Sequence, residues 1–308
     1  MNKPFFHTLA AIILLTAASG NAFCQAVMTM TTETNFREFE DKTIFEGDTL
    51  NGKIKTITQN TYGEYSKGKD VIYIFDEYGL QIRRKGIGQD IFYYYKFNKI
   101  IESSICRADN GKEYRKNEYL YDERGNLIKH IHIFLPNEKT ITKYFYNNEN
   151  KLIEERDSRK TIKYQYDANG DCVIEEEYGG KDVLTEKKEH KYINHKLVET
   201  FSWQRFEGED LYIKDLYTYN ENGTLKSNTH IIYHYGSKNH IAMENTTSYH
   251  YIYDDKNRLI EYKEINIGDY LDVTTTYENF DKKGNWQLKI TYKDGKETKV
   301  TRKFEYYD

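Results

Sequence analysis

The sequence YLYDERGNLI, from Tyr119 to Ile128, decides the fold, because variants of it recur along the whole chain. It begins with two aromatic residues two positions apart, continues with an acidic residue, and reaches a glycine that an apolar residue soon follows. Alternate residues of a β-strand point to the same face, so the two tyrosines would share one face. The stretch therefore predicts a strand, a tight turn and a returning strand.

The second aromatic of this stretch, Tyr121, is one of ten equivalent aromatic positions, which are spaced 20 to 34 residues apart. They are Phe75, Tyr95, Tyr121, Tyr146, Tyr166, Tyr192, Tyr219, Tyr253, Phe280 and Tyr306. Eight of the ten are preceded, two positions earlier, by another aromatic residue. A repeat of this length indicates an array of small supersecondary units, each of which needs its neighbours to bury its apolar face.

Seven copies continue with a five-residue connection that starts with Asp or Asn and has Gly or Asn at its fourth position. The first positions are Asp76, Asp122, Asn147, Asp167, Asn220, Asp254 and Asp281, and the fourth are Gly79, Gly125, Asn150, Gly170, Gly223, Asn257 and Gly284. Glycine and asparagine accept a left-handed backbone at low cost. An Asx turn followed by a left-handed residue and a bulge closes a β-hairpin with the correct twist. We predict this hairpin in all seven copies, and a different turn type after Tyr95 and Tyr192, where the connection is one residue shorter.

Two hairpin connections per repeat predict an all-β protein, a long antiparallel meander of about 20 strands. Twisted open sheets of more than ~10 strands curl or split. We therefore expect a curled or spiral sheet that forms an open shell. The array would occupy residues 48–308, after a linker or loose first strand at 26–47.

The first 25 residues resemble a secretory signal peptide, with one lysine, an apolar run from Leu9 to Ala18 and small residues toward Cys24. We therefore expect an exported protein, located in the periplasm, at the cell surface or in the medium. Lipid anchoring at Cys24 is not expected, because Phe23 occupies a position where such signals carry a small residue. Cys106 and Cys172 are read as free core residues rather than a disulfide.

The composition argues against nucleic acid as a partner. The 308 residues carry a formal net charge of -4, so there is no basic excess to neutralise phosphates. A membrane-spanning chain is not expected either. No later stretch reaches ~18 apolar residues, and polar residues interrupt the positions between the paired aromatics, which a membrane barrel would keep apolar.

The stretches YLYDERGNLI, YQYDANGDCVI, YTYNENGTLK and YIYDDKNRLI resemble the YD repeats of Rhs-type proteins and teneurins. The resemblance extends from about Val71 to Asp308. The chain as a whole also resembles small exported YD-repeat proteins of Bacteroides-like bacteria. It implies a long β-sheet wound into a hollow shell that serves encapsulation, adhesion or glycan contact. The chain departs from Rhs toxins because it lacks a proline-rich core signature, having only Pro4 and Pro136.

No motif indicates a catalytic, cofactor or metal site. The histidine pairs His130 with His132 and His230 with His234 lie at even spacing but lack further ligands, so we expect solvated strand histidines. The glutamate runs at 175–177 and 186–189 alternate with lysines and predict a solvated outer face.

We expect a non-catalytic exported scaffold that binds a protein or a glycan at the cell envelope, with no cofactor. The alternatives are a carbohydrate-binding module that uses exposed Tyr and Trp, and a hydrolase with an unrecognised site. The paired aromatics are expected to pack the sheet, so aromatic residues outside the repeat register are the candidate ligand-binding residues: Trp203, Phe206, Tyr233 and Tyr235. The sequence does not set the oligomeric state.

Overall fold

A computed structural model describes residues 42–45, 48–63, 66–86, 88–95, 101–108, 110–136, 138–206, 209–235, 241–267 and 272–308. These residues form 22 β-strands and one short 3-10 helix, η2 (Gly180–Asp182), and they contain no α-helix. The predicted signal peptide lies outside the described residues, as does the linker apart from its strand β1. The all-β prediction is confirmed.

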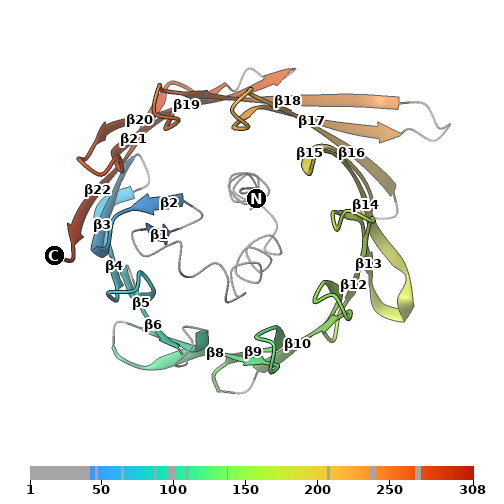
Figure 1. The fold of residues 1–308 in the computed structure, drawn as a ribbon, viewed down its shortest axis with the longest axis horizontal. Helices are drawn as coiled ribbons and strands as arrows, with labels where there is room; N and C mark the ends of the chain where they lie inside the picture. Colours follow the sequence, from blue (N-terminus) through green and yellow to red (C-terminus); the bar gives the residue numbers. More distant parts are fainter. Residues whose placement is uncertain are drawn as a thin grey trace, which may run out of the picture. The chain divides into compact units, whose positions relative to one another are not determined.

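The chain divides into two compact units, Met1–Ile141 with Thr275–Asp308 (unit 1) and Thr142–Thr274 (unit 2). The strands of unit 1 are β1 (Lys42–Phe45), β2 (Asp48–Asn51), β3 (Ile54–Gly63), β4 (Ser66–Phe75), β5 (Gln81–Gly86), β6 (Gln89–Tyr95), β7 (Ile101–Arg107), β8 (Glu113–Tyr121), β9 (Leu127–Phe134), β21 (Trp286–Lys293) and β22 (Lys296–Tyr306). The strands of unit 2 are β11 (Leu152–Arg156), β12 (Thr161–Tyr166), β13 (Cys172–Tyr178), β14 (Leu184–Ile193), β15 (Lys196–Phe206), β16 (Glu209–Tyr219), β17 (Leu225–Tyr235), β18 (Ile241–Tyr253) and β19 (Leu259–Ile267). The unit boundary falls inside β10 (Glu138–Tyr146) and β20 (Val273–Phe280). Within each unit, strands that follow one another in the sequence lie side by side (Figure 1).

The seven predicted hairpin turns are confirmed, and they share one hydrogen-bond pattern. In each, the N–H of the first residue donates to the carbonyl of the fifth, and the N–H of the fourth donates to the carbonyl of the first. The fourth residue is left-handed in all seven, with φ between 59° and 90°. At Asp122, the side-chain Oδ1 also accepts the N–H groups of Arg124 and Asn126, at 2.9 and 2.8 Å. The sequence pattern of these turns therefore translates directly into backbone geometry.

A β-bulge lies in the returning strand, beyond the left-handed residue at which the sequence predicts it. Tyr121 lies opposite Leu127, but Leu120 lies opposite Lys129, so Ile128 is an extra residue in the returning strand. The same shift occurs opposite Phe75, Tyr146, Tyr166, Tyr192, Tyr219 and Tyr253. A bulge increases the local twist of the strand pair. The repeat thus bends the sheet at regular intervals.

The shorter turn after Tyr192 has a different type, as expected. Asn194 and His195 both have positive φ, 51° and 61°, and they connect Ile193 to Lys196 as a two-residue hairpin loop. Two consecutive positive φ values define a type I′ turn. The corresponding turn after Tyr95 lies outside the described residues.

The expectation of an open spiral or open shell is wrong, because the strand order closes on itself. The hydrogen-bonded order of the 20 strands β3 to β22 is that of a closed antiparallel barrel. Its ends meet where β22 pairs with β3, from Lys299 opposite Tyr62 to Tyr306 opposite Ile54. Closure gives the main-chain groups of both end strands hydrogen-bond partners, which an open edge would leave exposed. The number of strands in the predicted meander is confirmed.

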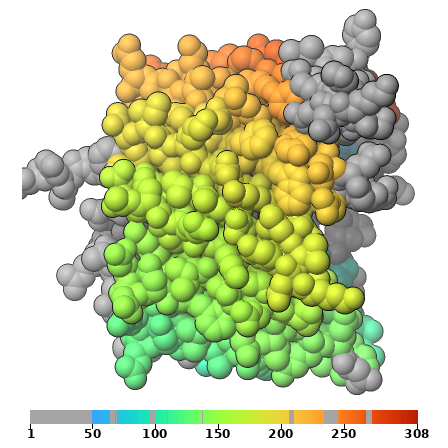
Figure 2. Space-filling view, turned by 90° about the vertical axis from the view of Figure 1, so that its right-hand side faces the viewer, coloured from blue at the N-terminus to red at the C-terminus, as the bar shows by residue number. Residues whose placement is uncertain are grey.

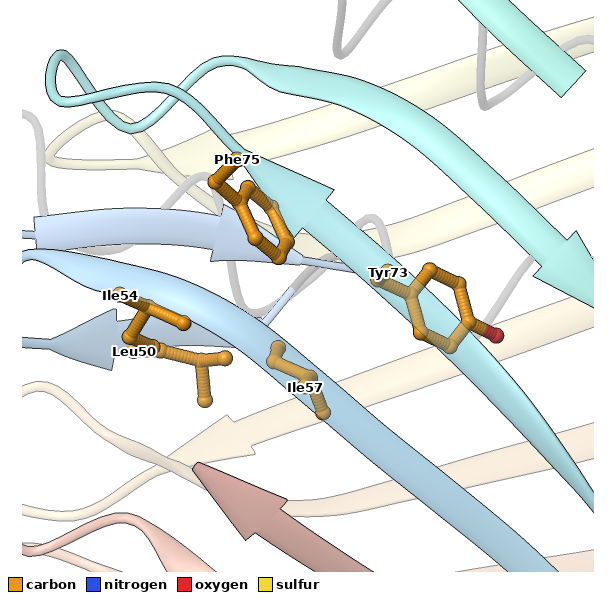
Figure 3. Packing of buried hydrophobic residues seen from close by; sticks show 5 residues of the cluster. All are labelled: Leu50, Ile54, Ile57, Tyr73 and Phe75. Carbon is orange, nitrogen blue, oxygen red and sulfur yellow. The ribbon is translucent and has the colours of Figure 1, made fainter. Parts of the chain in front are cut away.

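The repeat places its paired aromatics on one face of the sheet, which we call the repeat face; the other is the reverse face. In unit 1 the small sheet β1–β2 adds Leu50 to a buried cluster on this face, with Ile54 and Ile57 of β3 and Tyr73 and Phe75 of β4. Figure 3 shows these five side chains directed toward one another. The core of unit 1 is therefore built from repeat aromatics and β-branched neighbours.

Tyrosine hydroxyls link one repeat to the preceding one. The second tyrosine of a copy donates its hydroxyl to the carbonyl of the residue that lies opposite the second aromatic of the previous copy. These bonds join Tyr95 to Gln81 (2.8 Å), Tyr166 to Leu152 (2.8 Å) and Tyr219 to Leu197 (2.7 Å). The hydroxyl explains why these positions carry tyrosine rather than phenylalanine.

Candidate functional site

Three aromatic side chains lie in a row across neighbouring strands on the reverse face of unit 2. Trp203 of β15 is directly opposite Tyr212 of β16, and Tyr212 is directly opposite Tyr233 of β17. Residues directly opposite in an antiparallel pair point to the same face. We call Trp203, Tyr212 and Tyr233 the aromatic row.

The row is partly exposed and is held by neighbours on the same face. Phe201, 37% exposed, packs against Tyr212 with ring centroids 6.0 Å apart. The guanidinium of Arg205 lies 5.6 Å from the ring centroid of Trp203, and its Nε is 3.3 Å from Asp210. In the space-filling view, the strands of unit 2, coloured green to orange, form a continuous surface (Figure 2).

Of the four residues selected from the sequence, the structure brings Trp203 and Tyr233 together on either side of Tyr212. Phe206 and Tyr235 end their strands β15 and β17, and their side chains lie outside the described part of the structure. Sequence reasoning missed Tyr212 and Phe201. A usable signal existed for Tyr212, since in LYIKDLYTY it alternates with the repeat pair Tyr217 and Tyr219 and must therefore face the other way.

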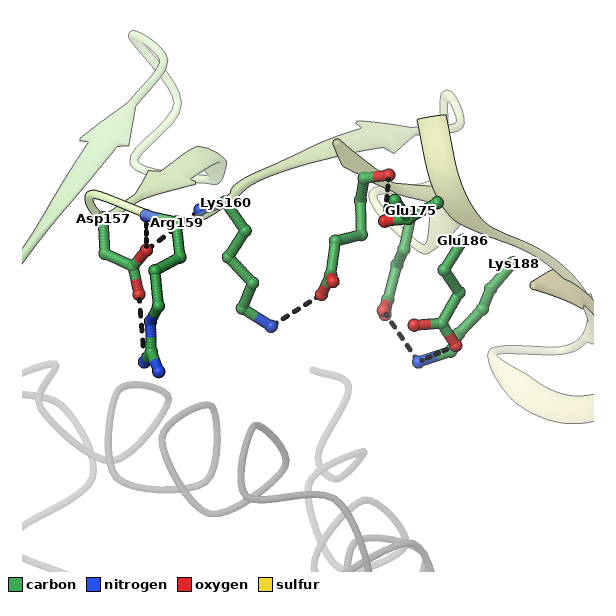
Figure 4. A network of polar contacts seen from close by, with 8 residues as sticks. Asp157, Arg159, Lys160, Glu175, Glu186 and Lys188 are labelled. Atoms are coloured by element: carbon green, nitrogen blue, oxygen red, sulfur yellow. Dashed lines mark hydrogen bonds and ion pairs between the residues drawn. The ribbon is translucent and has the colours of Figure 1, made fainter. Parts of the chain in front are cut away.

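The repeat face of unit 2 carries a network of charges instead of a continuous apolar surface. Lys160 Nζ lies 2.6 Å from Glu177, and Lys188 Nζ lies 3.3 Å from Glu186 and 4.0 Å from Glu175. Figure 4 shows Lys160, Glu175, Glu186 and Lys188 projecting from the same side of the ribbon. Glu175 is directly opposite Tyr164, which fixes the network on the repeat face.

The expectation that both glutamate runs lie on one solvated outer face is therefore wrong, because three of their five glutamates, Glu175, Glu177 and Glu186, lie on the repeat face. Residues of a strand alternate between faces, so Glu175 and Glu177 lie on the repeat face, while Glu176 lies on the reverse face. Sequence alternation could reveal that the run divides between two faces. It could not reveal that a lysine from β14 would lie opposite Glu175.

Burial and ion pairing change the proton affinities of this network in opposite directions. Burial raises the pKa of Glu155 above its ordinary value. Burial also raises the pKa of Glu175, but the hydrogen bond from His190 and the charge of Lys188 outweigh it, so the net pKa is lowered. Burial lowers the pKa of Lys188, and the charges of Glu175 and Glu186 more than reverse this effect. Glu175 and Lys188 are therefore held in their charged forms.

The histidines of β9 are not freely solvated, which corrects the expectation for that pair. The ring of His130 stacks on Tyr119 at a centroid distance of 4.6 Å, and its Nε2 lies 3.2 Å from Asn117 Oδ1. Burial and the neighbouring His132 lower the pKa of His130 to about 4. His130 is therefore neutral at pH 7 and forms part of the packing of unit 1.

In the second histidine pair, only His230 has a described side chain. His230 Nδ1 lies 2.7 Å from Asp215 Oδ1, and the side chain of His234 is outside the described residues. Within the described part of the chain, no group of three or more His, Cys, Asp or Glu side chains could hold a metal ion. Both described cysteines, Cys106 and Cys172, are free thiols, and burial raises the pKa of Cys172 to about 12.

No protein-family model matches the chain, and no curated protein matches it. Solved structures give distant likenesses. The Photorhabdus luminescens Tc holotoxin pore has 11% identity over 79% of this chain and 18% of its own, with a TM-score of 0.28. A porin-like protein from Bacteroides uniformis has 10% identity over 82% of this chain and 98% of its own, with a TM-score of 0.36. A porin-like protein from Bacteroides vulgatus has 9% identity over 82% of this chain and 98% of its own, with a TM-score of 0.31. We assign no family on these likenesses.

The chain thus spans about a fifth of the toxin chain that it resembles. Among the described residues, no helix has the length and apolar character needed to cross a membrane.

Proposed function

We propose that the chain is an exported, non-catalytic scaffold of YD repeats that binds a glycan through the aromatic row. The repeat assignment is supported by the seven turns, whose hydrogen bonds and left-handed residues are the same. Export is supported by the signal-like sequence from Met1 to Gln25. Together these two observations favour the cell envelope as the setting.

The observation that carries the proposal is the cross-strand register of Trp203, Tyr212 and Tyr233. Aromatic rings present an apolar surface, and tyrosine and tryptophan add a polar group at the edge. Sugars match this combination, because each ring has apolar C–H faces and a rim of hydroxyls. A row of such side chains on a sheet face is therefore suited to a chain of sugars.

Ion pairs with lysines engage three of the carboxylates on the repeat face, which favours a structural role over a hydrolytic one for these three. A glycosidase needs two carboxyl groups that flank one bond, one of them free to donate a proton. Glu175, Glu177 and Glu186 each lie within 4.0 Å of a lysine. Such ion pairs suit a structural role, and for Glu175 the net pKa is lowered.

A glycan array probed with the purified full-length chain tests the proposal. We expect saturable binding to one class of glycan, reduced about fivefold to tenfold by Trp203→Ala or Tyr233→Ala, since each stacked ring contributes on the order of 1 kcal/mol. The matched control is Phe145→Ala, another exposed aromatic of unit 2, which contacts Arg156 at a distance from the row in the strand order.

Circular dichroism and a denaturation curve would show that each variant is folded. An empty array, or equal binding by the wild type, Trp203→Ala and Phe145→Ala, would contradict a glycan site at the aromatic row.

A further inference from the structure

We infer that the aromatic row takes a neutral, extended, β-1,4-linked glycan that crosses the strands with one sugar on each ring. This inference rests on the proposed function and adds to it the charge, linkage, direction and length of the ligand.

The direction follows from the register. Trp203, Tyr212 and Tyr233 sit on three consecutive strands and are directly opposite one another, so the line that joins them runs perpendicular to the strands. Along β15 itself, Phe201 is displaced from Trp203 by two residues and lies opposite Lys214, so no second aromatic row continues beside the first. A ligand that contacts all three rings must therefore cross the strands.

The linkage follows from the spacing. Neighbouring strands lie about 4.8 Å apart, which places each ring of the row about one strand spacing from the next. This spacing is close to the length that one sugar adds to an extended β-1,4-linked chain. Both faces of a β-glucose ring carry axial hydrogens, so alternating sugars can each present an apolar face to the protein. An α-1,4-linked chain coils, and it cannot keep three consecutive sugars on a straight row.

The charge follows from the ion pairs around the row. Lys187, directly opposite Trp203, lies 2.7 Å from Glu189. Lys214 is two residues beyond Tyr212 on β16 and faces the same side, and its Nζ lies 3.1 Å from Glu199. Arg205 is paired with Asp210 on the other side of the row.

Each cation that borders the row is thus compensated by a carboxylate on the same face. An anionic sugar would have to displace these carboxylates or lie beside them, and like charges repel. A neutral sugar meets both donors and acceptors for its hydroxyls. The charge pattern therefore fits a neutral glycan better than a uronic acid or a sulfated one.

The length follows from the number of rings. Three rings accommodate three sugars, so affinity should rise up to the trisaccharide and then level off. Calorimetric titration of the full-length chain with β-1,4-linked gluco-oligosaccharides of two, three and four units measures this. We expect the trisaccharide to bind about fivefold to tenfold more tightly than the disaccharide, and the tetrasaccharide within about twofold of the trisaccharide.

Two further probes test the charge and the linkage. A β-1,4-linked glucuronate trisaccharide, which changes only the charge, and maltotriose, which changes only the linkage, should each bind at least about tenfold more weakly than the β-1,4-linked glucose trisaccharide. Raising the salt concentration from 0.05 to 0.5 M should change the affinity for the neutral trisaccharide by less than about twofold, because no net charge is neutralised.

The variant Tyr212→Ala, which removes the middle ring, should abolish the advantage of three sugars over two, whereas Phe145→Ala should retain it. Tighter, salt-sensitive binding of the β-1,4-linked glucuronate trisaccharide, equal binding of maltotriose, or affinity that keeps rising beyond three sugars would overturn the inference. If those results depend on Trp203, the proposed glycan site stands. If no glycan binds at all, the proposed function fails together with the inference.

Discussion

The tyrosines of the repeat differ in whether their hydroxyl groups form hydrogen bonds. Tyr219 donates its hydroxyl to the carbonyl of Leu197, at 2.7 Å. Tyr251, at the first aromatic position of its copy, is buried, and its hydroxyl has no hydrogen-bond partner among the described residues. The two hydroxyls should therefore contribute to stability with different signs.

We expect Tyr219→Phe to lower the free energy of unfolding by about 1 kcal/mol, because a buried carbonyl loses its donor. Tyr251→Phe should be neutral or slightly stabilising, since it removes a buried polar atom that has no partner. Urea denaturation followed by tyrosine and tryptophan fluorescence measures both changes. Equal losses in the two variants would contradict this role of the hydroxyl.

At this scale the sequence was most informative where backbone geometry alone was at issue. The left-handed conformation at Gly125 and Asn150 followed from residue type, because few other residues accept it. The acceptor of the Tyr219 hydroxyl did not follow, because Leu197 belongs to the preceding copy and its carbonyl is available only after the strands are in register.

The hairpin with its bulge is the element that the sequence repeats. Asp122 fixes both ends of one turn, with its Oδ1 accepting the N–H groups of Arg124 and Asn126. Burial raises the pKa of Asp122, but these hydrogen bonds outweigh it and hold the pKa below the ordinary value. The turn is therefore most stable with this carboxylate ionised.

We expect Gly125→Val to lower the free energy of unfolding by about 1 kcal/mol or more, because a β-branched residue is strained at a φ of 83°. The control is Arg124→Ala at the exposed neighbouring position, which should change stability little. Chemical denaturation of the two variants measures the difference. A negligible effect of both substitutions would show that the turn tolerates a side chain at its left-handed position.

Elements also explain why only part of the candidate site could be predicted. Trp203 and Tyr233 were selected because they stand outside the repeat register. Tyr212 was not selected, because its place between them depends on the pairing of β16 with both β15 and β17. Alternation within one strand gives the face of a side chain, but only the register between strands gives its neighbours.

For the molecule as a whole, closure depends on contacts between the two ends of the sequence. Asn285, 3% exposed, follows the left-handed residue of the last turn. Its amide exchanges two hydrogen bonds of 2.8 Å with the main chain of Asn51, 234 residues away. It also donates to the hydroxyl of Tyr306, at 2.9 Å.

We expect Asn285→Ala to lower the free energy of unfolding by about 2 kcal/mol or more, because it leaves buried main-chain groups of Asn51 without partners. The matched control is Asn126→Ala, at the same position of an internal copy, where the amide bonds to Asp122 of its own turn at 2.9 Å. The control should lose less than about 1 kcal/mol. Equal losses would mean that Asn285 serves only its own turn.

The number of strands could be predicted at this scale, but their closure could not. Each hairpin is a local pattern of some 25 residues, and counting such patterns gives the length of the meander. The pairing of β22 with β3 joins residues more than 230 positions apart, and no local pattern encodes it. The bulge at Tyr306, opposite Ile54, shows that β3 completes the last copy as an internal returning strand completes its own.

The returning strand of the last copy is β3, the first strand of the sheet. The sheet therefore cannot be completed strand by strand in the order of synthesis. Until β22 has been synthesised, β3 lacks its partner, and the nascent chain carries an unpaired edge that another polypeptide can capture. Pairing of β22 with β3 removes this hazard. Once β22 has paired with β3, neither strand can leave the sheet without breaking the hydrogen bonds of the other.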